Sequence, residues 1–431
     1  MSVDKTGEIC YNETSLSCIL TLHNAPKRGK GCSMQISERV KLCQQSPMRK
    51  FYPYSVEAVR QGKKIYHLNI GQPDIPTPPA FFDAVSAYAS DVLSYAPSPG
   101  APELLDAVRD YYAKLNVPLD SSDILITTGG SEALMMVMLS ILNPGDEVII
   151  PEPFYPNYAA FIHAAGGVIR PMDTNPAVGY WYADRARFEA LINERTKALL
   201  ITNPGNPTGV ILSEDEMAMI KDVAKEHDLY LISDEVYREF YYAGEGLRTM
   251  LEFEDAADHV LVVDSASKRF SACGARVGAL ISRNKELLGQ CLKFCQGRLA
   301  VASLDQAGAV ALYGLEPAYF DQNRAEYKLR RDTVVGKLRE IPGVICEEPK
   351  GAFYLMATLP VDDADKFQKW LLTDFQDKGE TVMFAPGEGF YATPGKGKNE
   401  IRIAYVLKQE DLARAIDLLA LGIREYNREN A

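Results

Sequence analysis

The stretch VVDSASKRFSACGAR, residues 262–276, places one lysine directly after an apolar run, with a serine before it and an arginine behind it. The apolar run predicts a buried strand that ends near Ser265. A lysine held at such a strand end can lose its proton through desolvation and nearby cations, and it then becomes an amine that attacks carbonyl groups. Lys268 is therefore a candidate nucleophile, and Ser265 and Arg276 are candidate donors to an anion.

These two donors suit a phosphate, because Arg276 presents a planar fork and Ser265 a hydroxyl. A reactive lysine beside a phosphate site suggests pyridoxal phosphate as the ligand. The pattern Ser-x-x-Lys also occurs in enzymes that form serine acyl intermediates. The interpretation therefore depends on the rest of the chain.

Two earlier apolar runs end in polar side chains that could meet Lys268. The sequence NPGNPTG begins at Asn203 after one run, and Asp234 and Tyr237 follow the other. Open parallel sheets bind ligands beyond the carboxyl ends of their strands. We therefore expect Asn203, Asp234 and Lys268 to converge in one crevice.

The motifs occur in an order that resembles one enzyme family. NPGNPTG from Asn203, Asp-x-x-Tyr from Asp234, Ser-x-x-Lys from Ser265 and Gly-x-Arg-x-Gly from Gly274 are similar to those of class I aminotransferases of fold type I. The likeness runs from about Ser46 to the end of the chain and is greatest to the aspartate aminotransferase branch. It implies a pyridoxal 5'-phosphate enzyme that moves an amino group from an L-amino acid, preferably aspartate, to a 2-oxo acid such as 2-oxoglutarate by a ping-pong mechanism.

The resemblance also implies a role for each candidate. Lys268 would hold the cofactor aldehyde and move a proton at the substrate's α carbon. Asp234 would keep the pyridine nitrogen protonated, which makes the ring a better electron sink. Asn203 and Tyr237 would donate hydrogen bonds to the phenolic oxygen of the ring, and the first of them is also expected beside the substrate.

A second glycine turn matches the phosphate end of the family's site. Gly130 and Ser131 stand between a strand-like and a helix-like run, and a helix start offers free amides and a positive dipole end to an anion. Alone, two glycines before a helix more often form an ordinary turn. By the resemblance, Tyr155 stacks on the cofactor ring and Tyr95 reaches the phosphate from the neighbouring subunit of a homodimer with shared active sites.

Substrate carboxylates call for arginine, which meets them through two hydrogen bonds. Arg402 stands in an apolar alternating segment, where burying an unpaired charge is costly. The resemblance implies that Arg402 binds the α-carboxylate beside the backbone of Gly71, since glycine allows a close approach. Arg298 lies near the position of the family's second arginine, which binds the distal carboxylate across the dimer, but its local sequence departs from that pattern.

Other functions stay open at this point. Aromatic residues such as Tyr95, Phe353 and Tyr354 could favour aromatic or other neutral amino acids. A fold type I enzyme could also act as a lyase or decarboxylase, because substrate orientation selects the bond that breaks. A cofactor-binding regulator without catalysis would need a basic helix-turn-helix, which the short amino-terminal stretch lacks.

Alternating strand-like and helix-like runs predict an α/β fold with a mainly parallel seven-stranded-type sheet, covered on both faces. The strand candidates are centred on Leu125, Val148, Leu199, Leu231, Val262 and Ala279. The expected division is a large cofactor-binding domain over residues 76–318 and a smaller mixed α/β domain over residues 319–431. Residues 34–75 would form an amino-terminal arm that packs on the small domain.

The first 33 residues fall outside the resemblance and are expected to be a disordered extension. They lack the basic lead-in and full apolar core of a secretory signal. Met34, just before the family-like pattern, is a candidate for the true start of the protein.

Composition limits the partners of the chain. Its 431 residues are 47% apolar and 24% charged, with a net charge of -12 and no basic stripe for nucleic acid. No apolar stretch approaches the roughly twenty residues needed to span a bilayer, so a cytoplasmic location is expected. Eight cysteines without a Cys-x-x-Cys pair and five scattered histidines indicate neither a metal site nor a disulfide framework.

Overall fold

The computed structural model describes residues 2–3, 9–10, 35–43, 47–243 and 247–430. The chain separates into two compact units, Met1–Lys41 and Leu42–Ala431. In the first unit β1 (Ser2–Val3) pairs antiparallel with β2 (Ile9–Cys10). Apart from these two strands, the expected extension over residues 1–33 lies outside the described residues. The short helix α2 (Glu38–Leu42) ends at the start of the second unit.

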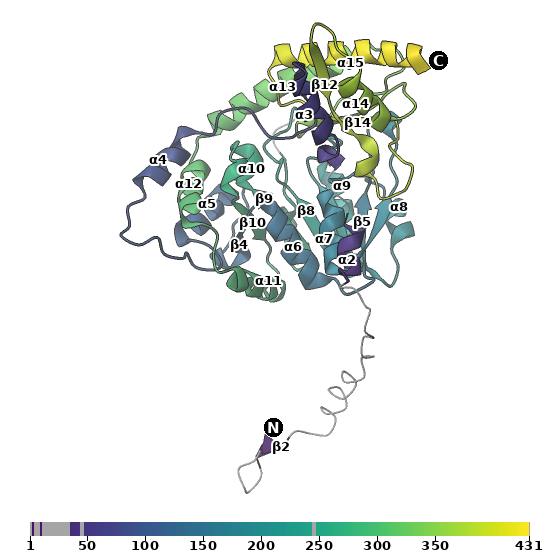
Figure 1. Cartoon of the computed structure of the whole chain (residues 1–431). Helices are drawn as coiled ribbons and strands as arrows, with labels where there is room; N and C mark the ends of the chain where they lie inside the picture. The colour runs from purple at the N-terminus through teal and green to yellow at the C-terminus, as the bar shows by residue number, and fades with distance from the viewer. Residues whose placement is uncertain (1, 4–8, 11–34, 44–46, 244–246, 431) are drawn as a thin grey trace, which may run out of the picture. The chain divides into compact units, whose positions relative to one another are not determined.

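A seven-stranded sheet forms the centre of the second unit (Figure 1). Its strands, in chain order, are β4 (Ile124–Thr127), β5 (Glu147–Pro151), β6 (Val168–Met172), β7 (Thr196–Thr202), β8 (Tyr230–Asp234), β9 (Val260–Ser265) and β10 (Gly278–Ile281). In space the order is β4-β10-β9-β8-β7-β5-β6. Strand β10 runs antiparallel to both neighbours, and the other pairs are parallel. The predicted α/β fold with a mainly parallel sheet is confirmed.

All six strand candidates lie in this sheet, and the strand without a candidate is β6. Its sequence VIRPM contains Arg170 and Pro171, and only Met172 is fully buried. The strand lies at the sheet edge, where a proline removes no ladder hydrogen bond that a neighbour needs. The apolar signal that predicts a buried strand is therefore weak there.

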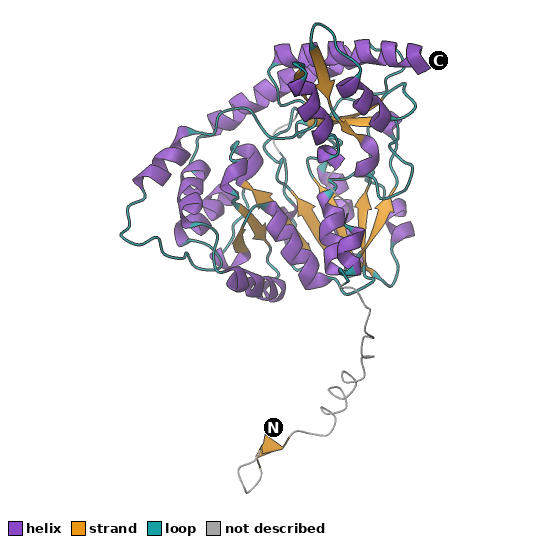
Figure 2. Cartoon of the chain, viewed as in Figure 1, coloured by secondary structure: helices purple, strands orange, loops and turns teal. Residues whose placement is uncertain are grey.

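Helices cover both faces of the sheet (Figure 2). Along β7, Leu199 and Ile201 face one apolar cluster, whereas Ala198 and Leu200 face the other, because successive strand residues point to opposite faces. The helices of the first face are α5 (Pro102–Ala113), α9 (Glu214–Glu226) and α12 (Ser303–Tyr313). The helices of the second face are α6 (Gly130–Ile141), α7 (Asn157–Ala165) and α11 (Lys285–Arg298).

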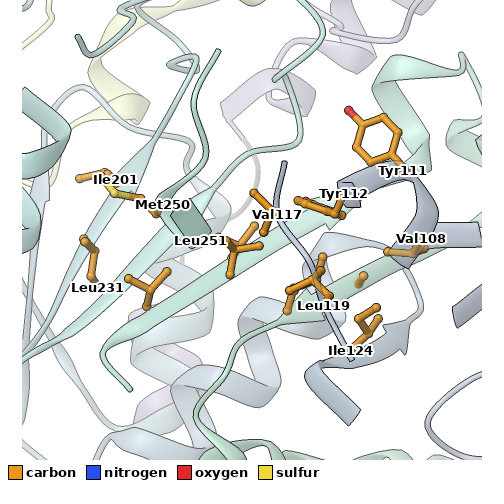
Figure 3. Close-up of a cluster of buried hydrophobic side chains, with 14 of the residues drawn as sticks. Val108, Tyr111, Tyr112, Val117, Leu119, Ile124, Ile201, Leu231, Met250 and Leu251 are labelled. Carbon is orange, nitrogen blue, oxygen red and sulfur yellow. The ribbon is translucent and has the colours of Figure 1, made fainter. Parts of the chain in front are cut away.

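Part of the first cluster is drawn in Figure 3, where Val108 and Tyr112 of α5 lie near Leu119 and Ile124. The shorter helices around the sheet are α4 (Pro79–Ala87), α8 (Arg185–Leu191) and α10 (Ala266–Arg269). The 3-10 helices of the second unit are η2 (Pro47–Arg49), η3 (Ser121–Asp123), η4 (Pro176–Val178), η5 (Met250–Glu252), η6 (Glu254–Ala256), η7 (Cys273–Ala275) and η8 (Gly387–Phe390). The two clusters pack helices against both faces of the sheet, and this packing positions the strand ends.

Two small sheets lie beyond the large one. Strand β14 (Glu400–Ala404) pairs antiparallel with β11 (Tyr354–Thr358) and β13 (Ala385–Pro386). Strand β3 (Lys64–His67) pairs parallel with β12 (Glu380–Met383), so a segment that precedes the large sheet joins one that follows it. The helices around them are α3 (Tyr52–Arg60), α13 (Pro317–Arg339), α14 (Ala364–Thr373) and α15 (Gln409–Asn430).

The expected domain boundaries near residues 33, 75 and 318 stay predictions. Among the helices of the described residues, none is long and apolar enough to cross a membrane. The cytoplasmic location also stays a prediction.

Candidate active site

A cavity of about 340 Å³ lies where β8 and β9 end, and it reaches across to β14. Besides Tyr354, its lining includes ten of the residues that the sequence singles out. They are Gly71, Gly130, Ser131, Tyr155, Asp234, Tyr237, Ser265, Lys268, Arg276 and Arg402. Four other residues named from the sequence, Tyr95, Asn203, Arg298 and Phe353, do not line it. The volume falls in the range of ordinary small-molecule sites.

Lys268 reaches the cavity from α10, which begins directly after β9. Ser265 caps this helix, because its Oγ accepts a hydrogen bond from the backbone N–H of Ser267 at 3.1 Å. Nζ of Lys268 donates to the carbonyl oxygen of Gly71 at 3.0 Å and lies 3.7 Å from Sγ of Cys273. The amine is thus held against the backbone of the segment that precedes the large sheet.

Asp234 ends β8 and is buried at the floor of the cavity. It accepts hydrogen bonds from the Tyr158 hydroxyl at 2.6 Å and from the backbone N–H of Val236 at 3.3 Å. Burial raises the pKa of Asp234 to about 6, and the nearby acids Asp264 and Glu235 push it in the same direction. Both donors are neutral, so a cationic nitrogen beside this carboxylate would stabilise its charged form. A protonated pyridine nitrogen fits that place.

An anion cradle lies where α6 begins against β10. A Cβ atom on Gly278 would lie 2.6 Å from the carbonyl carbon of Gly129 and 2.7 Å from the backbone nitrogen of Gly130. Arg276 donates from Nη2 to the carbonyl oxygen of Thr128 at 3.4 Å, and a Cβ atom on Gly129 would lie 2.5 Å from that nitrogen. Free helix amides and a guanidinium therefore meet in a space kept open by glycine, which fits a phosphate.

Arg402 lies in β14 with only 1% of its surface exposed. Its Nη2 donates to the carbonyl oxygen of Asn69 at 2.7 Å, and Nη1 donates to Oδ1 of Asn206 at 3.4 Å. The guanidinium also lies over the Tyr354 ring, 4.6 Å from the centroid. Burial lowers the pKa of Arg402, but a guanidinium keeps its charge at neutral pH. This fixed cation suits a carboxylate ligand.

Gly71 is needed where the main chain passes the cavity. A Cβ atom there would overlap the hydroxyl of Tyr354, which donates to the Gly71 carbonyl oxygen at 3.4 Å. The same hydroxyl lies 3.0 Å from the hydroxyl of Tyr237. Burial raises the pKa of Tyr237 well above its ordinary value, so this phenol stays protonated and can donate a hydrogen bond.

The structure contradicts the expected place of Asn203. Its backbone N–H donates to the carbonyl oxygen of Asp234 at 3.0 Å, which continues the pairing of β7 with β8. The side chain turns away from the cavity, where Oδ1 accepts from the backbone N–H of Leu212 at 3.1 Å and Nδ2 lies 3.7 Å from the sulfur of Met217. Asn206 lines the cavity instead.

The amide Nδ2 of Asn206 donates to the Tyr237 hydroxyl at 3.2 Å. The sequence contains two Asn-Pro pairs in this loop, and nothing in the order of residues separates them. Tyr158, which bonds Asp234, and Arg49, which lines the cavity from η2, were also absent from the predicted set. No spacing signal marks either residue, because each reaches the site from a separate element.

Tyr155 lines the cavity, and its hydroxyl accepts a hydrogen bond from Nδ2 of Asn157 at 2.7 Å. Burial raises the pKa of Tyr155 to about 12. Tyr95 is 79% exposed and does not line the cavity of its own chain. Arg298 pairs with Glu132 at 2.9 Å and donates to the carbonyl oxygen of Ile126 at 2.7 Å. The roles of Tyr95 and Arg298 stay predictions.

Comparisons with known proteins agree with this site. The sequence model of the family "Aminotransferase class I and II" matches residues 63–419. The aspartate aminotransferase of Musicola paradisiaca is 32% identical over 378 residues, which cover 85% of this chain and 91% of that protein. A single-mutant form of the Thermus thermophilus aspartate aminotransferase superposes with a TM-score of 0.83 at 28% identity, covering 90% of this chain and all of the other. The alanine aminotransferase of Pyrococcus furiosus has a TM-score of 0.83 at 27% identity, with 91% and 100% covered.

A mainly parallel sheet with a lysine, a buried carboxylate and an anion cradle at its strand ends defines an enzyme with an anionic cofactor. The chain belongs to the class I and II aminotransferases. Within that family it stands in the aspartate aminotransferase branch, and its cofactor is pyridoxal 5'-phosphate.

Proposed function

We propose that this enzyme transfers the amino group of L-aspartate to a 2-oxo acid such as 2-oxoglutarate by a ping-pong mechanism. The observation that carries the proposal is that Lys268 and a buried arginine line the same cavity. Lys268 offers an amine and Arg402 a fixed carboxylate site, and both line the cavity beside the segment Asn69–Gly71. An α-amino acid bound through its carboxylate at Arg402 would present its α carbon toward Lys268.

Different residues of the chain would bind the different parts of the cofactor. Asp234 would accept the N–H of the pyridinium, and Asn206 and Tyr237 would donate hydrogen bonds to the phenolic oxygen. Tyr155 would cover one face of the ring. The phosphate would be held by Gly130, Ser131, Ser265 and Arg276, with Tyr95 of a second subunit.

Pyridoxal phosphate, when bound, supplies the electron sink that accepts the negative charge left at the substrate's α carbon. Lys268 removes the proton from that carbon and returns a proton to the cofactor side, because its Nζ is the only amine that the cavity lining offers within the described residues. Arg402 fixes the direction in which the α carbon faces this amine. Orientation of this kind selects loss of the α proton over loss of the carboxylate.

The proposed assembly is a homodimer with shared active sites. Large apolar side chains near Tyr95 are exposed, including Val92 at 68% and Leu93 at 61%. A surface of this kind is typical of a protein contact. A second subunit there would bring Tyr95 to the neighbouring cavity.

The test follows the visible absorbance of the purified holoenzyme as L-aspartate is added, and then 2-oxoglutarate. We expect the colour to bleach with aspartate and to return with the 2-oxo acid, while oxaloacetate and glutamate are formed. The Lys268→Ala variant, which keeps the cavity, should catalyse neither step.

A second candidate is an aminotransferase for neutral amino acids, which the aromatic ring of Tyr354 in the cavity favours. If L-alanine or L-phenylalanine bleaches the colour and L-aspartate does not, the amino donor is a neutral amino acid and the enzyme is still an aminotransferase. Release of carbon dioxide or ammonia without return of colour would overturn transamination itself.

A further inference from the structure

The charges that line the cavity are unbalanced. Four lining side chains are cationic, namely Arg49, Lys268, Arg276 and Arg402, whereas Asp234 is the one acidic lining residue among the described residues. In the proposed function Lys268 takes the proton, Arg276 meets the phosphate and Arg402 meets the α-carboxylate. Arg49 has no anion assigned to it.

Arg49 ends η2 at the mouth of the cavity and is exposed. It makes no hydrogen bond and no ion pair with any other residue in the part of the chain that the structure describes. It lines the cavity beside Ile70, Gly71 and Gln72, the same segment that accepts the hydrogen bond from Lys268. A free guanidinium therefore stands beside the backbone that the substrate must pass.

The backbone on both sides of Arg49 is anchored. Pro47 lies against Gly389, where a Cβ atom would overlap the proline ring. Lys50 pairs with Asp365 at 2.6 Å, and Phe51 is buried in a small apolar cluster. The backbone of Arg49 is thus held in place while its guanidinium is open, so a ligand has to order only the side chain and not the main chain.

Arg298, the residue expected from the sequence to bind a distal carboxylate, already uses two of its three guanidinium nitrogens within its own chain. Its Nε lies 2.9 Å from Glu132 and its Nη2 donates to the carbonyl oxygen of Ile126 at 2.7 Å. A ligand would have to compete with a carboxylate that is permanently attached to the same chain. Arg49 faces no such competitor within the described residues.

We propose that Arg49, rather than Arg298, binds the side-chain carboxylate of a dicarboxylic substrate and sets the preference for aspartate and glutamate over neutral amino acids. The inference rests on the proposed function and names the residue that selects its substrate. The α-carboxylate would lie at Arg402 and the α carbon toward Lys268. The side chain of the substrate would then extend to the open mouth of the cavity, where its carboxylate would form an ion pair with Arg49.

The first experiment compares the holoenzyme with its Arg49→Gln variant. We expect kcat/KM for aspartate and glutamate to fall roughly 10- to 100-fold, the effect of removing one charged hydrogen-bonded partner. The value for alanine should change by no more than about twofold. Arg60→Gln removes the same charge from the end of α3, which does not line this cavity and does not anchor Arg49, and Arg298→Gln tests the competing residue. Neither control should alter the ratio of aspartate to alanine.

The second experiment measures binding without turnover. Succinate and butyrate have the same carbon number, but only succinate carries a second carboxylate. Calorimetric titration of the Arg49→Gln holoenzyme should show succinate binding weakened about tenfold and butyrate binding unchanged. Equal weakening of both ligands, or loss of succinate binding in Arg298→Gln with none in Arg49→Gln, would overturn the inference.

The two proposals can fail separately. If the parent enzyme does not bleach with aspartate, the proposed donor is wrong, and the succinate titration still decides the role of Arg49. If the parent acts on aspartate but Arg49→Gln keeps the same ratio of aspartate to alanine, only the assignment of Arg49 fails.

Discussion

Asn203 and Asn206 carry the same side chain and both precede a proline, but their side chains lie in different places and have different hydrogen-bond partners. Asn206 lines the cavity and donates to the Tyr237 hydroxyl, whereas Asn203 accepts from the backbone of Leu212 outside the cavity. Only Pro204 and Gly205 lie between them. The direction of each side chain follows from the backbone path of this loop and not from its composition.

Alanine substitutions should separate the two roles. Asn206→Ala should lower kcat/KM roughly 10- to 100-fold, because the ring's oxygen loses a donor, and should leave stability nearly unchanged. Asn203→Ala should lower the free energy of unfolding by about 1–3 kcal/mol, because a buried N–H group loses its acceptor, with kcat/KM within about twofold of the parent. Steady-state kinetics and urea unfolding measure both. Equal losses of kcat/KM in the two variants, measured at saturating pyridoxal phosphate, would contradict these separate roles.

Asp234 predicts a pH effect of unusual sign for a carboxyl group. Burial raises its pKa from the ordinary value of 3.8 to about 6 in the apoprotein. Between these values the folded state binds more protons than the unfolded state, so this group's contribution to stability falls as the pH rises and is constant above the window.

The matched variant is Asp234→Asn, which stays neutral at every pH. The free energy of unfolding of this variant minus that of the parent apoprotein should increase from pH 4 to pH 6 and then stay constant. The full increase across the window between the two pKa values is on the order of 3 kcal/mol. Urea unfolding of both apoproteins at pH 4.5, 5.5, 6.5 and 7.5 gives the curve. A stability difference between the two apoproteins that does not change with pH would show that burial does not raise the pKa of Asp234.

At the scale of elements, the contact of α6 with β10 shapes the anion cradle. Gly278 lets the strand approach the start of the helix, since a Cβ atom would lie 2.6–2.8 Å from backbone atoms of Gly129, Gly130 and Asp264. None of these backbone atoms can move without shifting a strand or a helix. The glycine is therefore a condition for the helix start to face the cavity.

Gly278→Ala should destabilise the protein by about 1–3 kcal/mol through overpacking and should weaken cofactor binding, because the helix amides move away from the phosphate. Gly289→Ala in α11 is the control, since its Cβ atom would meet nothing within 4 Å. This control should be neutral or stabilising by up to about 1 kcal/mol. Urea unfolding and cofactor titration measure the two effects. Similar behaviour of the two variants would show that the contact is not tight.

Most of the elements could be predicted from sequence periodicity, and the exceptions have physical causes. Helix α13 (Pro317–Arg339) begins at a proline, which suits a first helical turn. Strand β6 has no continuous apolar signal, because an edge strand is buried on fewer sides. Pairing partners, such as β3 with β12, could not be predicted because they depend on segments more than 300 residues apart.

At the scale of the whole molecule, a shared active site would connect two copies of the chain. Tyr95 is 79% exposed and lines no part of the cavity of its own chain. We expect Tyr95→Ala to weaken cofactor binding and activity. A shared site also predicts complementation, since a hybrid dimer has one cavity with both Lys268 and Tyr95 intact.

Mixing the inactive Lys268→Ala variant with Tyr95→Ala under conditions that exchange subunits should restore roughly a quarter of the parent activity, the share of complete sites in a random mixture. The sedimentation of each variant confirms that dimers are present. Activity that is simply the average of the two unmixed variants would place Tyr95 outside the shared site.

The sequence by itself determined the cofactor chemistry of this protein and the order of its central strands along the chain. Apolar runs mark buried strands, and the polar residues directly after them, Asp234 and Lys268, lie at strand ends by local connection alone. The tertiary structure alone decided that Asn206 and not Asn203 lines the cavity, that Arg298 pairs with Glu132, and that Arg49 lines the cavity without an ion pair to any described residue. These outcomes depend on side-chain direction and on contacts between distant segments, which packing fixes only after the whole core has formed.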